Sequence, residues 1–141
     1  MCVRRDATLM SVLRGSMPGV DTCFLIDFLA GVPEAVALYK EQQERLCVSD
    51  LVIYEFLSGN ITETQERRFI ALVDECVLAS FERNEAITSA RLFRELRKQG
   101  KTRSSADIAI AGSYLANHVA TILTRNVRDF AGIPGLTAVG Y

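Results

Sequence analysis

Short apolar runs alternate with longer amphipathic segments along most of the chain. RLCVS, CVLASF and VATILT are short and mainly apolar, as is typical of strands buried in a parallel sheet. VDTCFLIDFL starts as a short strand and continues as a helix, RNVRDFAGIPG reads as a loop, and LTAVGY is a weak final strand. Strands separated by helices predict an α/β fold, with a central parallel sheet flanked by helices on both faces.

Capping residues mark where several of the helices begin. Pro33 stands at a favoured first-turn position, and Thr62 with Gln65 has the spacing of a capping box. The segment NEAITSARLFRELRKQG has helical periodicity, basic residues in its last turn and a terminal glycine, so it predicts a long helix.

The stretch SSADIAIAG raises a question about Asp107. Ser104 followed by an acid three residues later, before an apolar run, is the signature of a capped helix, and we expect this helix to run to about Asn117. The carboxylate of Asp107 can serve the cap or face a ligand, and the stretch alone leaves both alternatives open.

Three further acids fall where ligands bind in such a fold. Asp21 ends the first strand, and Asp129 follows the strand VATILT; both therefore lie at the carboxyl edge of the sheet, where loops and helix starts converge. Glu55 lies about two turns into the helix after RLCVS. Asp21 can also be a helix cap, Glu55 a solvated acid and Asp129 a turn residue. Asp27 is expected on a helix surface.

Composition limits the possible partners. The chain has 141 residues, with 16 basic and 17 acidic side chains and a formal net charge of -1, so it lacks the excess positive charge of proteins that hold nucleic acid by bulk electrostatics. The four cysteines form no C-x-x-C motif, and we interpret them as reduced. With neither a signal-peptide pattern nor a membrane-length apolar run, we expect a cytoplasmic protein.

The first residues do not follow the pattern of the rest. Residues 1–16 show little periodicity and are expected to be a loosely ordered extension, with a single domain over residues 17–141. Met17 is then an alternative natural start, which the mass of the native protein would test.

Four blocks of the sequence, in order, carry a resemblance to a known family. DTCFLIDFL, VSDLVIYEFLSG, SSADIAIAGSYLANHVATILTRNVRDF and IPGL resemble PIN-domain ribonucleases, in particular the VapC-type toxins of bacterial and archaeal toxin–antitoxin pairs. The resemblance implies a three-layer PIN-like α/β domain. It also implies a metal-dependent endoribonuclease whose first three acids correspond to Asp21, Glu55 and Asp107.

The fourth acid of the family departs from the usual pattern. Many relatives carry it at the position of Asn126 in this chain, and the nearest acid is Asp129. We expect Asp129 to be the fourth carboxylate, with Asn126 as the alternative. Because Asn126 replaces an acid, a catalytically silent PIN-fold binding module is the alternative function. A phosphatase that forms an aspartyl phosphate at Asp21 is disfavoured, since DTC lacks a second acid two residues on.

Crowded carboxylates favour a metal site. They repel one another unless a divalent cation lies among them, and an all-oxygen ligand set favours Mg²⁺ or Mn²⁺ over Zn²⁺. Such a cation activates water for attack on a phosphodiester. Residues expected to support these ligands are Thr22, Ser105, Thr124 and Asn126. Residues expected to contact RNA phosphate, unless they are merely solvated, are Arg103, Arg125 and Arg128.

The resemblance also implies protein partners. These are a cognate antitoxin that covers the site and a second copy of the chain in a homodimer. The segment FIALV, residues 69–73, is a possible antitoxin contact; as a periodic apolar stripe it can equally be ordinary core. The single His118 is expected to be structural or exposed.

Overall fold

The structure, a computed structural model, describes residues 17–42, 44–101 and 103–141. The predicted extension 1–16 lies outside the described residues. The strands are β1 Gly19–Val20, β2 Cys47–Ser49, β3 Val77–Ala79, β4 Thr121–Leu123 and β5 Thr137–Val139. The helices are α2 Thr22–Leu29, α3 Pro33–Glu41, α4 Asp50–Leu57, α5 Glu63–Glu75, α6 Arg83–Lys98, α7 Ser105–Ala116 and α8 Val127–Phe130.

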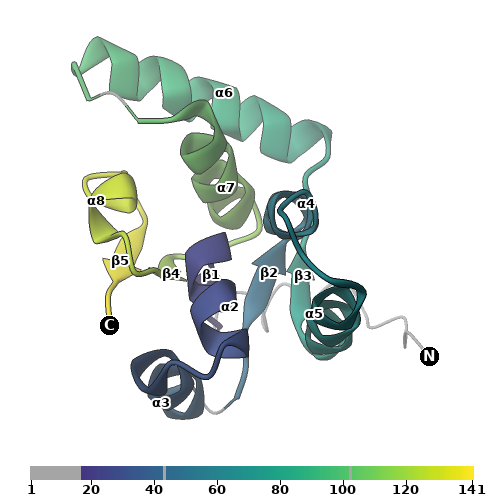
Figure 1. The fold of residues 1–141 in the computed structure, drawn as a ribbon. Coiled ribbons are helices and arrows are strands. Elements are labelled where there is room, and N and C mark those ends of the chain that lie inside the picture. The colour runs from purple at the N-terminus through teal and green to yellow at the C-terminus, as the bar shows by residue number, and fades with distance from the viewer. Residues whose placement is uncertain (1–16, 43, 102) are drawn as a thin grey trace.

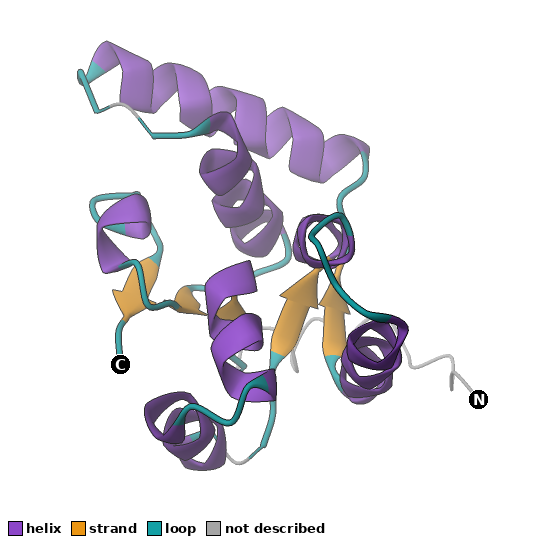
Figure 2. Cartoon of the chain, in the orientation of Figure 1, coloured by secondary structure: helices purple, strands orange, loops and turns teal. Residues whose placement is uncertain are grey.

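The strands form one parallel sheet in the order β3-β2-β1-β4-β5. Figure 1 shows α2 in front of the centre of the sheet and α6 with α7 above it, and Figure 2 shows the strands enclosed among helices. The predicted three-layer α/β fold with a parallel sheet is confirmed. Because β1 and β4 are central neighbours that leave the sheet in the same direction, the segments after them meet at one edge.

Most helix boundaries agree with the predicted caps. Thr62 and Gln65 form the reciprocal capping box, Pro33 opens α3, and the hydroxyl of Ser104 accepts the backbone N–H of Asp107 at 3.1 Å. The loop predicted for RNVRDFAGIPG is wrong in part, because it contains the short helix α8. The side chain of Phe130, buried against the core, explains this turn of helix in a polar segment.

Tyr114 joins the neighbouring strands β1 and β2 from inside the core. Its side chain is fully buried, and its hydroxyl accepts the backbone N–H groups of Val20 at 3.0 Å and Ser49 at 3.1 Å while donating to the carbonyl of Val20. A Cβ on Gly19 would lie 2.7 Å from the tyrosine ring, so only glycine permits this approach. The ends of β1 and β2 are thus fixed relative to α7.

No helix among the described residues is on its own long and apolar enough to cross a bilayer, although α2 and α3, bent by 108°, pass by length and composition when taken together. No disulfide joins Cys23, Cys47 or Cys76 within the described residues, and Cys2 lies outside them. His118 is exposed.

Tyr114→Phe should destabilise the fold strongly. The change leaves two buried N–H groups without their acceptor, each costing about 1–3 kcal/mol, so the free energy of unfolding should fall by about 2–6 kcal/mol. Urea denaturation measures it. The matched control is Tyr39→Phe, which removes the hydroxyl of a partly buried tyrosine packed on Phe28. Equal stability losses in the two variants would contradict the role given to Tyr114.

Candidate active site

Four acids lie near the carboxyl edge of the sheet, each on a different segment of the chain. Asp21 follows β1 and caps α2, and Glu55 lies on α4, which follows β2 directly. Asp107 is in the first turn of α7 and Asp129 is in α8, just after β4. The parallel topology therefore brings together residues separated by most of the length of the chain.

Asp21 is the buried member of this group, with 5% of its surface exposed. One carboxylate oxygen accepts the backbone N–H of Phe24 at 2.9 Å, and the other accepts the hydroxyl of Thr124 at 2.5 Å. Burial nevertheless raises the pKa of Asp21, and the negative charges of Asp107 and Glu55 raise this pKa further. Asp21 is thus a helix cap whose ionised form is disfavoured by its surroundings.

The sequence left open whether Asp107 serves the start of α7 or faces a ligand. Its backbone is capped by Ser104, while its carboxyl group lies in the field of the other acids. Desolvation raises the pKa of Asp107, and so do the negative charges of Asp129 and Glu55. The cap and the alternative role therefore coexist, and all four predicted acids are coupled electrostatically.

The side chains as they stand do not enclose an ion. Within residues 17–42, 44–101 and 103–141, no three His, Cys, Asp or Glu side chains converge closely enough to hold a metal. The donor chemistry does fit a hard divalent cation, because every acid offers oxygen and like charges raise the pKa of two of them. Glu55 is exposed, so its side chain is free to change rotamer.

Thr22 adds a second feature to this region. Its side chain is buried, and its hydroxyl has no hydrogen-bond partner among the described residues. Buried polar atoms are nearly always satisfied, and Thr22 lines the same pocket as Glu55. An unsatisfied hydroxyl beside the acids is suited to a water molecule or a ligand oxygen.

The other predicted supporting residues differ in what they contact. Thr124 donates to Asp21 and accepts the backbone N–H of Asn126 at 2.9 Å. The side chain of Asn126 donates to the sulfur of Cys23 at 3.2 Å, so it is turned toward α2. Ser105 is exposed at the start of α7, and the neighbouring Ser104 supplies the cap.

An ion pair between the exposed Arg125 and the buried Asp27 lies beside the site and was not predicted. Asp27 is 6% exposed, so the prediction of a surface residue is wrong. Arg125 donates to both of its carboxylate oxygens, at 2.9 and 3.0 Å, and the hydroxyl of Tyr141 donates to it at 2.6 Å. The spacing of these residues in sequence gives no sign of the contact. This network fixes the segment after β4, which contains Thr124, against α2.

The three predicted phosphate-binding arginines are therefore not equivalent. Arg125 is paired with Asp27, and Arg103 donates to the carbonyl of Ala131 at 2.8 Å. Arg128 is exposed on α8, one residue before Asp129. Of the three, Arg128 is the one whose position best suits an incoming phosphate.

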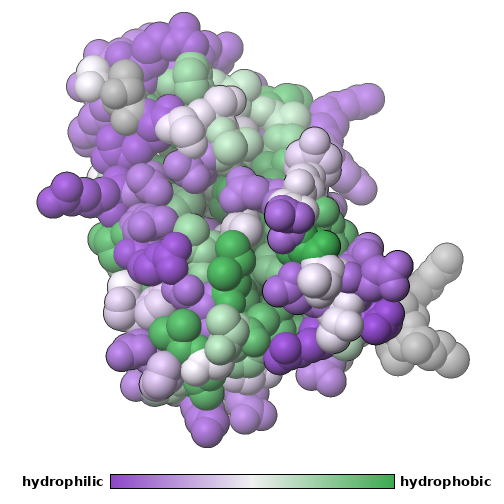
Figure 3. Space-filling view, viewed as in Figure 1, coloured by the Kyte–Doolittle hydropathy of each residue, from purple (hydrophilic) through white to green (hydrophobic). Residues whose placement is uncertain are grey.

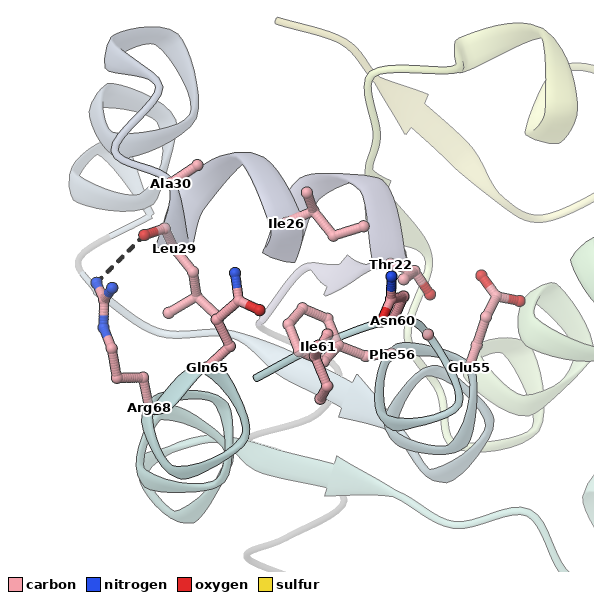
Figure 4. Close-up of a pocket in the computed structure, with 11 residues that line it drawn as sticks. Thr22, Ile26, Leu29, Ala30, Glu55, Phe56, Asn60, Ile61, Gln65 and Arg68 are labelled. Carbon is pink, nitrogen blue, oxygen red and sulfur yellow. Dashed lines mark hydrogen bonds between the residues drawn. The ribbon is translucent and has the colours of Figure 1, made fainter. Parts of the chain in front are cut away.

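A pocket of about 390 Å³ opens beside the acids. Thr22 and Glu55 lie at one end and Arg68 at the other, where it donates to the carbonyl of Leu29 at 3.2 Å (Figure 4). The walls between them are mainly apolar and come from α2, α4, α5 and the turn between α4 and α5: Ile26, Leu29, Ala30, Phe56, Gly59, Asn60, Ile61 and Gln65.

The FIALV segment only partly belongs to the surface. Phe69 is fully buried and stacks on Phe56, with ring centroids 3.9 Å apart, whereas Ile70 is 44% exposed. Leu72 and Val73 pack against the core. Phe69 therefore belongs to the core, Leu72 and Val73 lie at its edge, and Ile70 remains at the surface.

Comparisons with known proteins agree with this architecture. The model of the PIN domain matches residues 20–136, so the chain belongs to the PIN-domain family, as its sequence blocks predicted. No curated protein matches the chain.

Several solved structures share the fold. A chain of the DNA-bound VapBC structure from Salmonella typhimurium has a TM-score of 0.71 and 22% identity, covering 88% of this chain and 97% of its own. One of VapBC2 from Rickettsia felis, bound to a fragment of promoter DNA, has a TM-score of 0.75 and 16% identity, covering 89% and 98%. One of a toxin–antitoxin complex from Klebsiella pneumoniae has a TM-score of 0.71 and 25% identity, covering 86% and 95%.

Asp107→Asn should stabilise the metal-free protein at neutral pH. Because the folded-state pKa of Asp107 is raised, the folded state binds more protons than the unfolded state in the window above the ordinary aspartate pKa. Wild-type stability therefore falls as pH rises through that window. The variant lacks this loss.

Thermal unfolding in EDTA measures the effect. The melting temperature of Asp107→Asn should exceed that of wild type at neutral pH, and the difference should vanish at acid pH near the ordinary aspartate pKa. Asp74→Asn, at an exposed position on α5, is the control. A variant less stable than wild type at neutral pH would contradict the electrostatic argument.

Proposed function

We propose that this protein is a metal-dependent endoribonuclease, the toxin of a type II toxin–antitoxin pair. The observation that carries the proposal is the electrostatic coupling of Asp21, Glu55, Asp107 and Asp129 at one edge of the sheet. A protein gains no stability from crowding like charges, so such a cluster indicates function. The PIN-domain match and the toxin–antitoxin structures support the same conclusion.

The proposed cofactor is Mg²⁺, or Mn²⁺ in its place. Asp21, Glu55, Asp107 and Asp129 would hold it, and the unpartnered hydroxyl of Thr22 is suited to a water molecule beside it. When bound, a cation of this kind neutralises the acids, polarises a phosphate oxygen and lowers the pKa of water.

The remaining residues prepare this arrangement. Thr124 keeps Asp21 oriented by donating to it. The Arg125–Asp27 pair holds the segment after β4, which contains Thr124, against α2, so Arg125 is a positioning residue. Arg128, which is exposed, is therefore the stronger candidate for phosphate contact. His118, the single histidine of the sequence, is exposed, so we propose no Ser–His or Cys–His nucleophile pair, and hydrolysis by activated water is the chemistry that the four acids support.

The proposed protein partners are a cognate antitoxin and a second copy of the chain. Structures of the same fold are of VapBC and toxin–antitoxin complexes. The pocket between Glu55 and Arg68 suits an apolar antitoxin segment better than FIALV does, because Phe69 is already buried in the core. A segment seated there would lie against Glu55 and obstruct the acids. A cytoplasmic location remains a prediction.

Cleavage of RNA is the direct test. Purified protein should cut a mixed pool of structured RNA with Mg²⁺ or Mn²⁺ and not with EDTA. Asp107→Asn and Glu55→Gln should each lower the cleavage rate by about 10²-fold or more, since each removes a proposed ligand of the metal. Asp74→Asn is the matched control and should cut at the wild-type rate.

Other outcomes separate the alternatives. Equal cutting by all variants would indicate a contaminant or a different site and would contradict the proposal. No cutting together with no metal binding would favour a silent PIN-fold binding module. A covalent beryllofluoride-type adduct at Asp21 would revive the aspartyl-phosphate alternative.

The homodimer is testable on the toxin alone. Size-exclusion chromatography with light scattering at micromolar concentration should give twice the monomer mass. A monomer mass throughout that range would contradict the homodimer.

A further inference from the structure

A second groove adjoins the acids on the other side of α4. It lies between α4 and α7, encloses about 370 Å³ and is lined by Tyr54, Glu55 and Ala106 among others. Tyr54 is 74% exposed, more than any other large hydrophobic side chain among the described residues. Tyr54 precedes Glu55, a proposed ligand of the metal, and its exposed aromatic ring is therefore available to bind a partner.

Beyond this groove lies a third hollow with basic walls. It lies between α6 and α7, encloses about 300 Å³ and is lined by Phe93, Arg94 and Arg97. The guanidinium of Arg97 lies over the ring of Phe93, 4.7 Å from its centroid. Within the described part of the chain, no carboxylate lies within 4.0 Å of either guanidinium, since the one ion pair found there is Arg125–Asp27.

The two hollows and the acids follow one another around α7. Successive helical residues are rotated by about 100°. Ala106 and Ile110 line the groove that contains Tyr54. Ser105 and Ile108 line the hollow that contains Arg94 and Arg97. On the helix, the face with Ala106 and Ile110 lies between Asp107 and the face with Ser105 and Ile108. Ala109 lines both hollows. The order is therefore acids, aromatic ring, arginines.

That order matches the chemistry of a single RNA strand. Phosphates repeat along it, with a base between each pair that can stack on an aromatic ring. In Figure 3 the part of the surface at the top, where α6 lies, carries many hydrophilic residues with apolar ones between them. A purely apolar partner would leave Arg94 and Arg97 without counter-charge.

We propose that a nucleobase of the RNA substrate stacks on Tyr54, while the phosphates that follow it bind Arg94 and Arg97. This inference rests on the proposed function, since it supplies the path by which RNA enters the acids. The path selects for unpaired RNA, because a base inside a duplex cannot reach the ring.

Tyr54→Trp gives the chain its only tryptophan, since the natural sequence has none. The variant is made in the Asp107→Asn background, so that RNA binds without being cut. A fluorescein-labelled mixed-sequence RNA single strand is titrated in, and tryptophan fluorescence and fluorescein anisotropy are recorded together. Tryptophan quenching should saturate with the same midpoint as the anisotropy. Ile70→Trp, exposed on α5 and outside both hollows, should show no quenching.

Substitutions at the two parts of the path give separate readouts. Tyr54→Ala should weaken binding by about tenfold, and Tyr54→Phe by no more than about twofold, because stacking needs the ring and not the hydroxyl. Arg94→Gln and Arg97→Gln should each lower the salt slope of binding by about 0.7. Arg83→Gln, at the opposite end of α6, should leave the slope unchanged.

The outcomes distinguish this inference from the function on which it rests. RNA that binds neither the wild-type chain nor the variants would contradict both. RNA that binds without quenching the tryptophan fluorescence of the Tyr54→Trp variant would overturn the stacking proposal and leave the ribonuclease proposal intact. Without RNA, the tryptophan fluorescence of the Tyr54→Trp variant could change with protein concentration while its mass in solution doubles. That result would assign the groove to contact between two copies of the chain and overturn the stacking proposal.

Discussion

The hydroxyl of Tyr114 is the interaction on which the rest of the edge depends. It is bonded to the backbone of β1 at Val20 and of β2 at Ser49, the last residues before Asp21 and before the helix that carries Glu55. The same side chain belongs to α7, which carries Asp107. One buried group therefore fixes the relative positions of three of the four acids, and the contact requires Gly19 to have no side chain.

The strands and helix held by Tyr114 carry acidic side chains that repel one another. Burial and neighbouring negative charges raise the pKa of Asp21 and of Asp107, and the hydroxyl of Thr22 is left without a partner. Each feature lowers the stability of the metal-free protein. We interpret them as preparation for the proposed cation, whose binding would relieve the repulsion among the acids.

The fold was predictable from sequence because its elements carry local signals, whereas the assignment of Glu55 and Asp107 to the site rests on the resemblance of the sequence blocks. Strand and helix periods define the α/β order, Ser104 and Thr62 mark helix starts, and position after a parallel strand places Asp21 and Asp129 at one edge. The Arg125–Asp27–Tyr141 network was not predictable, because its members are far apart in sequence and carry no motif. The short helix α8 was missed for the same reason, since only the burial of Phe130 against distant residues explains it.

The central claim is that the four acids form a site for a divalent cation, and calorimetry of Mn²⁺ binding tests it most directly. Titrations at neutral pH in buffers of different ionisation enthalpy would give both the affinity and the protons released. Saturable binding is predicted, and lowering the pH toward the ordinary aspartate pKa should weaken binding and increase the number of protons released, because the pKa of Asp21 and of Asp107 is raised in the free protein. Wild-type protein that neither binds Mn²⁺ nor releases protons would contradict the account.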